Sequence, residues 1–137
     1  VMYGNCHHQK ILNSDIQSVW ETVLCVKRYS RWRSDLSKTQ VIHDGRFIEY
    51  TQDGFATHFT VTKTEPYRRW EFDLENSRIR GHWTGLFTAQ GTRTQIEFTE
   101  CVTAKNSLMK LVLKPYLKKQ QAQFVQDLKR ELEAQRR

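Results

Sequence analysis

Apolar and polar residues alternate along most of the middle of the chain. In residues 69–75, Trp70, Phe72 and Leu74 alternate with Glu71, Asp73 and Glu75. The same period of two recurs in residues 55–63 and 93–103. This alternation is typical of a strand with one buried and one solvent-facing side. Each of these segments is therefore predicted to be a strand.

Turn signals separate the alternating segments. The dipeptides Asp44-Gly45 and Asp53-Gly54 favour tight hairpins, and reversals are also expected near residues 65–67, 76–77 and 90–91. Successive hairpins predict a meander of about six antiparallel strands. Residues 4–12 are a further candidate strand before it.

Helical spacing appears on both sides of the meander. Ile16, Val19, Trp20 and Val23 recur at i, i+3, i+4 and i+7, with Ser14 or Asp15 as the expected N-cap. A short helical or irregular segment is expected over residues 29–35. The chain therefore has two short helical segments between its first strand and the meander.

The C-terminal segment predicts one long helix. No glycine follows Gly91, and from Ser107 the composition of Leu, Lys, Gln and Glu favours a helix to about Gln135, roughly 40 Å long. Pro115 lies inside it and predicts a kink or a break. An apolar stripe with helical spacing marks its buried face: Leu117, Phe124, Val125, Leu128 and Leu132.

These elements predict an α+β fold. A sheet with one apolar face must cover that face, and the terminal helix is the largest apolar element available to do so. A curved sheet of about seven strands wrapped around that helix would leave a cavity between them. The 137 residues fit one domain, spanning 1–137.

The chain resembles the START-like, or SRPBCC, superfamily, and within it the bacterial polyketide cyclase/dehydrase-like members. The resemblance extends from about Cys6 to Glu133 and is carried by the motifs IQSVWETVL at 16–24, RYSRW at 28–32, WTGLF at 83–87, TQIEF at 94–98 and DLKRELE at 127–133. The chain departs from the family pattern at Ser30, where proline is usual, and at Cys25, where Asp or Asn is frequent.

The resemblance implies the helix-grip fold and an internal cavity. Members of the superfamily bind lipids, sterols, polyketides, quinones or hormones there, and a minority catalyse cyclisation or aromatisation. It therefore implies a small hydrophobic or amphipathic ligand and no cofactor.

Aromatic side chains on the predicted inner faces are candidate ligand contacts, although such residues also fill ordinary cores. Trp83 has Gly81 and Gly85 on the same face at i−2 and i+2, and we expect the missing side chains to leave open space beside it. The candidate ligand-binding residues are Phe59, Trp70, Phe72, Trp83, Phe87, Phe98, Glu100, Tyr116 and Phe124.

Glu100 shares the parity of Ile96, Phe98 and Val102, which aims its carboxyl group inward. Buried carboxyl groups are costly unless paired and often mark sites. The alternative is a bulge near the strand end that turns Glu100 to solvent. No catalytic constellation is visible. If the protein is a cyclase-type or aromatase-type enzyme, Glu100 is the acid–base candidate, with Tyr50 or Tyr116 as partner hydroxyls.

Metal and redox sites have no support in the sequence. The five histidines show no metal-ligand spacing, and His58 and His82 share parity with polar faces, so we expect both in solvent. The three cysteines form no C-x-x-C pair. They are predicted to be free thiols of a cytoplasmic protein, since neither a secretory signal nor a membrane-length apolar run is visible.

The net charge of +7 is concentrated at one end of the chain. Residues 105–137 contain nine basic and three acidic side chains, whereas the rest is nearly neutral. A solvated helix face is the simplest explanation, and no nucleic acid is expected. The alternatives are an interaction module for ribosome, RNA or anionic membrane, the membrane contact being transient.

Apolar residues 108–113 are expected to pack against the helices in 15–33, with a ligand portal, dimer contact or membrane-touching tip as alternatives. The protein is expected to be a monomer or a weak dimer.

Overall fold

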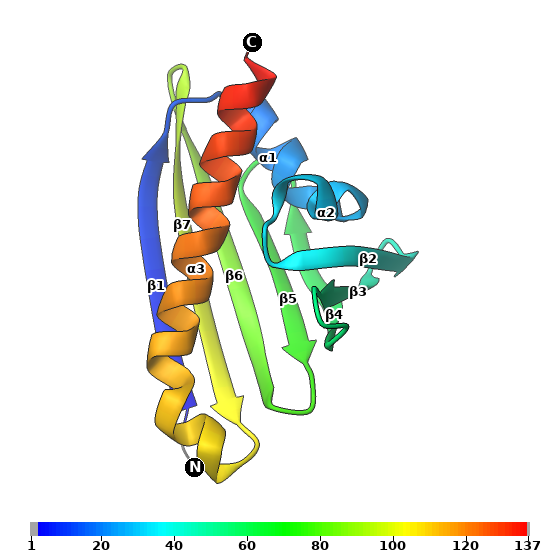
Figure 1. The fold of residues 1–137 in the computed structure, drawn as a ribbon. Helices are drawn as coiled ribbons and strands as arrows, with labels where there is room; N and C mark the ends of the chain where they lie inside the picture. The colour runs from blue at the N-terminus through cyan, green and yellow to red at the C-terminus, as the bar shows by residue number, and fades with distance from the viewer. Residues whose placement is uncertain (1–2, 137) are drawn as a thin grey trace.

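The computed structural model describes residues 3–136, which form a seven-stranded antiparallel sheet, a long C-terminal helix and short helical segments after the first strand (Figure 1). In chain order the elements are β1 (Tyr3–Leu12), α1 (Ile16–Leu24), a 3-10 turn η1 (Val26–Arg28), α2 (Tyr29–Trp32), β2 (Leu36–His43), β3 (Arg46–Thr51), β4 (Ala56–Glu65), β5 (Arg69–Glu75), β6 (Ile79–Gln90), β7 (Arg93–Ala104) and α3 (Ser107–Gln135).

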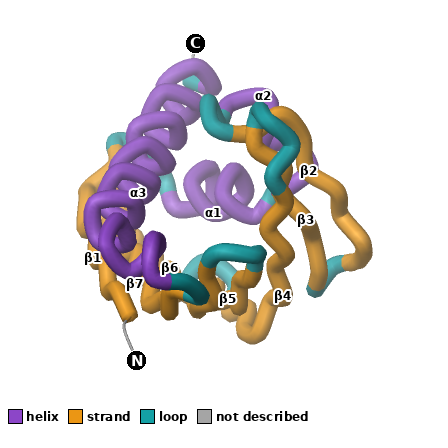
Figure 2. Tube along the Cα trace, turned by 60° about the horizontal axis from the view of Figure 1, so that its bottom comes forward, coloured by secondary structure: helices purple, strands orange, loops and turns teal. Residues whose placement is uncertain are grey.

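The sheet has the order β1-β7-β6-β5-β4-β3-β2. The meander runs from β2 to β7, and β1 then pairs with β7 at the far edge. The sheet curves around α3, which crosses its concave side, while α1 and α2 close one end (Figures 1 and 2). This is the predicted α+β helix-grip arrangement.

The core lies between the concave face of the sheet and α3. The alternation of the strands puts Trp70, Phe72 and Leu74 of β5 inside, as predicted. The buried side of α3 presents Met109, Leu113, Leu117, Gln121, Val125, Leu128 and Leu132 to this core, and α1 adds Val19, Trp20 and Val23. The period of two in the strands and the period of 3.6 in the helices therefore both identify the residues of this core.

One of the two alternatives for Pro115 is wrong, because α3 continues through this residue without a break. The missing amide would have bonded to the carbonyl of Leu111, and both residues are exposed, so water can solvate the freed carbonyl. Asp15 is the N-cap of α1, as expected, although its side chain makes no capping hydrogen bond.

The first turns of α3 do not pack against residues 15–33. Leu108, Leu111 and Val112 are 72%, 80% and 42% exposed, whereas Met109 and Leu113 are buried. This end of α3 lies near the start of β1, away from α1 and α2 (Figure 1). The expectation that these three apolar side chains pack against the helices in residues 15–33 is therefore wrong. No helix within residues 3–136 is both long and apolar enough to span a membrane.

Candidate ligand-binding cavity

A cavity of about 100 Å³ lies between the concave face of the sheet, α3 and the segment that joins α1 to β2. Its size is of the same order as the ~150 Å³ engineered cavity that binds benzene. It therefore suits one ring or a short chain, with the remainder of a larger ligand in the mouth.

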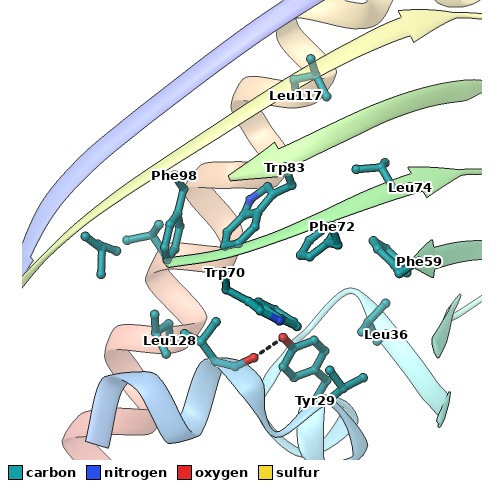
Figure 3. Close-up of a cluster of buried hydrophobic side chains, with 14 of the residues drawn as sticks. Tyr29, Leu36, Phe59, Trp70, Phe72, Leu74, Trp83, Phe98, Leu117 and Leu128 are labelled. Carbon is teal, nitrogen blue, oxygen red and sulfur yellow. Dashed lines mark hydrogen bonds between the residues drawn. The ribbon is translucent and has the colours of Figure 1, made fainter. Parts of the chain in front are cut away.

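Aromatic rings form a continuous wall on the sheet side. Phe47 stacks on Phe59 with ring centroids 4.7 Å apart, and Phe72 stacks on Trp83 at 4.8 Å. Phe59 meets Phe72 edge to face at 5.2 Å, which joins the two pairs. Figure 3 shows Phe59, Phe72 and Trp83 along successive strands. The wall offers both ring faces and ring edges to an apolar ligand.

The opposite wall is set by Tyr29 of α2, which is buried. Its hydroxyl donates a hydrogen bond to the carbonyl of Val23 at the end of α1 (Figure 3). Burial raises the pKa of this hydroxyl, so Tyr29 stays neutral. The bond holds α2 against α1. It thereby positions the segment after α2, which carries a charged side chain of the cavity.

That group is Arg33, just after α2. Its Nη1 donates to Glu49 of β3 at 2.8 Å, and its Nη2 and Nε donate to the carboxylate of Asp35 at 2.9 and 3.2 Å. The guanidinium carbon also lies 5.1 Å from the Tyr29 ring centroid and 5.0 Å from that of Phe124. Burial lowers the pKa of Arg33, but the two carboxylates outweigh it and raise the pKa, so the group stays charged.

Glu100 of β7 also lines the cavity. Glu100 is only 9% exposed, and its carboxyl group has no hydrogen-bond partner among residues 3–136. Burial, and next the charge of Glu49, raise its pKa to about 7, although Arg33 acts in the opposite direction. The pairing of β6 with β7 is continuous from Ile79–Ala104 to Gln90–Arg93, so the expected alternative of a bulge is wrong. Glu100 therefore presents an unpartnered carboxyl group to the cavity near neutral pH.

Partly exposed lining residues mark the mouth of the cavity. Tyr116 and Gln120 come from α3, and Thr51, Phe55 and Thr57 come from the region of the β3–β4 turn. Viewed from this end, α3 lies opposite β2–β4 with the β5–β6 turn between them (Figure 2). The mouth therefore lies next to the first half of α3.

Eight of the nine predicted ligand-binding residues line the cavity: Phe59, Trp70, Phe72, Trp83, Phe98, Glu100, Tyr116 and Phe124. Phe87 does not, because it packs edge to face on Trp20 and on Phe98, with centroids 5.0 and 5.9 Å apart. Tyr50 is also outside the lining and bonds Gln40 on the neighbouring strand.

The expected open space beside Trp83, above Gly81 and Gly85, does not exist. A Cβ atom on Gly85 would lie 2.4 Å from the Trp83 ring, and one on Gly81 would lie 2.3 Å from Val102. The space above both glycines is therefore filled, by Trp83 itself and by a neighbouring strand. Gly85 lets the indole lie flat along its own strand.

Arg33, Asp35 and Glu49 were missed by the sequence analysis. Glu49 shares parity with the buried Phe47, a signal of the same kind as that for Glu100. Arg33 and Asp35 follow a four-residue helix and have no periodicity to place them. Only the tertiary fold brings them to the cavity.

Groups that could bind a metal are not found among residues 3–136. His58 is exposed as expected, whereas His82 is half-buried on the outer face, with its ring nitrogens 2.7 Å from Asp73 and 2.8 Å from Glu71. The three cysteines are free, as expected, with Cys101 exposed.

The family model for polyketide cyclase / dehydrase and lipid transport matches residues 7–133. The chain belongs to this family. That membership agrees with the START-like resemblance and with the cavity, and none of the curated proteins matches the chain.

Solved structures show the same fold at low sequence identity. A START superfamily protein from Mycobacterium smegmatis superposes with a TM-score of 0.87 at 8% identity, covering 95% of this chain and 97% of that one. The Zhui aromatase/cyclase from Streptomyces gives 0.85 at 12% identity, with 98% and 96% covered. Norcoclaurine synthase from Thalictrum flavum, in complex with dopamine and hydroxybenzaldehyde, gives 0.72 at 12% identity, with 93% and 85% covered. At these identities the likeness concerns the fold alone.

Proposed function

We propose that this member of the polyketide cyclase and lipid transport family binds a small hydrophobic or amphipathic molecule, of lipid, polyketide or quinone-like type, in its cavity. One observation carries the proposal: an aromatic-walled cavity contains a buried carboxyl group, Glu100, that no protein group satisfies. The carboxyl group faces the open space of the cavity, where a hydroxyl or amine group of a ligand can hydrogen-bond to it. The free thiols fit a cytoplasmic location, which belongs to the same proposal.

Native mass spectrometry of the freshly purified protein, with organic extraction, tests this proposal. We expect a stoichiometric bound species or, for the empty protein, saturable uptake of a fluorescent hydrophobic probe. Gln120→Trp should block the mouth and weaken uptake about tenfold or more, because it places a large ring where Gln120 lines the opening.

Gln126→Trp is the matched control, because Gln126 is exposed on the same helix and does not line the cavity. Thermal melting of both variants checks their folding. Equal uptake by the two variants would contradict the cavity as the binding site.

A second candidate is a cyclase-type or aromatase-type enzyme. It is favoured by the pKa of about 7 at Glu100, which suits proton transfer at neutral pH, and by the nearby hydroxyl of Tyr116. In this case Glu100→Gln should abolish turnover of the extracted ligand while binding persists. Ligand that is bound but recovered unchanged from the parent protein would favour simple binding.

We also propose that the first turns of α3 make transient contact with an anionic membrane. Leu108, Leu111 and Val112 lie at i, i+3 and i+4 and form one exposed apolar stripe. Lys110, Lys114, Lys118 and Lys119 are exposed on the same half of the helix. Apolar side chains flanked by lysines match a bilayer surface with anionic headgroups. The stripe lies beside the cavity mouth, which would give an apolar ligand a route between bilayer and cavity.

Vesicle flotation tests this contact, with phosphatidylcholine alone or mixed with phosphatidylglycerol. The parent should float only with the mixed vesicles, and less so at high salt. The double variant Leu108→Ser/Leu111→Ser should reduce binding about tenfold. The control is Ile11→Ser/Ile42→Ser, at residues 48% and 51% exposed elsewhere on the surface. Equal losses in both double variants would refute a specific docking stripe.

A further inference from the structure

We propose that the cavity selects its ligand by charge: it accepts an apolar ring that carries an amine or a hydroxyl group, and it rejects the corresponding carboxylate. The inference rests on the proposed ligand binding and narrows it to a class. It is carried by the set of charged groups that line the cavity and by their hydrogen bonds.

The cavity has more carboxyl groups than cations. Asp35, Glu49 and Glu100 line it, and Arg33 is the only cationic side chain among the described lining residues. Both ends of the Arg33 guanidinium are engaged, with Glu49 at 2.8 Å and Asp35 at 2.9 Å. An anionic ligand would have to compete with both carboxylates for this one cation. The described lining residues therefore offer no free cation to a carboxylate or a phosphate.

Glu100 needs a partner of a particular kind. When it is ionised, its carboxylate accepts hydrogen bonds and attracts a cation; when it is protonated, it also donates one hydrogen bond. An ammonium group satisfies the ionised form, and a hydroxyl group satisfies either form. A ligand carboxylate satisfies only the protonated form, and beside Glu100 it would bring two like charges together.

The aromatic wall favours the same class. Trp83 is the direct strand neighbour of Glu100, and its ring stacks on Phe72 and meets Trp70 edge to face. Ring faces attract cations and repel anions. The aromatic wall and the carboxyl groups therefore both favour a cationic ligand over an anionic one.

The preference should depend on pH. The groups that act on Glu100 or are acted on by it are Glu49 of β3, Arg33 after α2, Tyr116 of α3 and Cys6 of β1, and Asp35 lines the same cavity. Arg33 remains cationic, and burial keeps the Tyr116 and Cys6 pKa values raised, so these two stay neutral near pH 7. Ionisation of Glu100 through a pKa of about 7 then makes the cavity more negative as the pH rises.

The experiment compares benzylamine, benzyl alcohol and benzoate, which share one ring and differ in their polar group. Binding is followed by the fluorescence of Trp70 and Trp83 and by ligand-observed NMR. At pH 8 we expect benzylamine to bind at least about tenfold more tightly than benzoate, corresponding to a coupling of about one pKa unit. The ratio should shrink at pH 6, and benzyl alcohol should change little.

Glu100→Gln should reduce the amine-to-carboxylate ratio about tenfold at pH 8 and remove most of its pH dependence. The matched control is Glu97→Gln, on the same strand but the outer face, where Glu97 lies near His7. This control should keep the parent ratio.

Equal binding of the three probes, or tightest binding of benzoate, would overturn charge selection and leave ligand binding intact. An unchanged ratio in Glu100→Gln would overturn the role of Glu100. Binding of none of the three, together with an empty native mass spectrum, would refute the proposed function and the charge selection with it.

Discussion

Glu100 is the residue at which burial and charge conflict most strongly. Its pKa is raised from 4.5 to about 7, so the folded protein favours the protonated form more than the unfolded chain does. Stability from this residue is therefore complete below about pH 4.5 and is lost as the pH rises through 7. Glu100→Gln cannot ionise and should escape this loss. We expect the free energy of unfolding of the variant, relative to the parent, to increase by about 2 kcal/mol from pH 5 to pH 8.

Urea denaturation at both pH values measures this difference. Glu97→Gln serves as the control, because it lies on the outer face of the same strand and should show a far smaller pH effect. A difference between Glu100→Gln and the parent that stays constant with pH would mean that Glu100 titrates normally. Its unpartnered, buried placement would then have no energetic consequence.

At the scale of elements, Asp127 joins the long helix to the segment that supplies Arg33. Its side chain is fully buried and accepts bonds from the amide and the hydroxyl of Ser34, both at 2.9 Å. Gln123 and Arg130 of α3 donate to its other oxygen at 2.9 and 2.8 Å. The buried carboxylate thus links α3 to the start of β2, and it orders the backbone next to Arg33.

Asp127→Ala should lower the free energy of unfolding by about 2–3 kcal/mol at pH 7, because it leaves the Ser34 amide without its partner. Burial raises the Asp127 pKa, but the hydrogen bonds and the charge of Arg130 outweigh it and lower the pKa below 3.8. The loss should therefore persist above about pH 4 and narrow below it. Glu133→Ala, at an exposed position of α3, is the control in the same denaturation experiment. Equal effects of the two substitutions would exclude a special role for Asp127.

Most elements could be predicted from periodicity because each has one face in a shared core. The alternation around Trp70 and Phe72 and the helical stripe through Leu128 both report burial, and burial is what defines these elements. Glu100 was found for the same reason, as a polar residue in an inward position. The alternative of a break at Pro115 is wrong because water can reach the carbonyl that proline leaves without a donor.

The polar part of the site was less accessible to sequence reasoning. Parity identifies the face of a strand but not the neighbours on that face, so Phe87 was placed inward correctly although it packs on Trp20 and Phe98 and does not line the cavity. Arg33 lies in a segment too short for a periodic signal. Its position depends on the Tyr29–Val23 bond and on Asp127, which are contacts between separate elements.

At the scale of the whole molecule, the exposed apolar stripe and the cavity mouth lie at the same end. The amide of Lys105, just before α3, donates to the carbonyl of Arg78 in the β5–β6 turn at 2.8 Å, so these two segments form one tip. The β2–β3 hairpin lies on the opposite side of the molecule from the start of α3 (Figures 1 and 2). A protein docked through Leu108 and Leu111 would therefore turn the mouth toward the bilayer and keep this hairpin in water.

Hydrogen exchange in the presence of anionic vesicles should reveal this orientation. We expect exchange to slow several-fold in residues 106–113 and in the β5–β6 turn, because the bilayer covers both. The β2–β3 hairpin is an internal control, since Val41 and Ile42 are also exposed apolar residues, at 47% and 51%, but lack the neighbouring lysine cluster. Protection of the hairpin in place of the α3 tip would show that apolar exposure alone directs binding. The basic helix would then have no part in bringing the cavity to a membrane, and ligand exchange would have to occur through water.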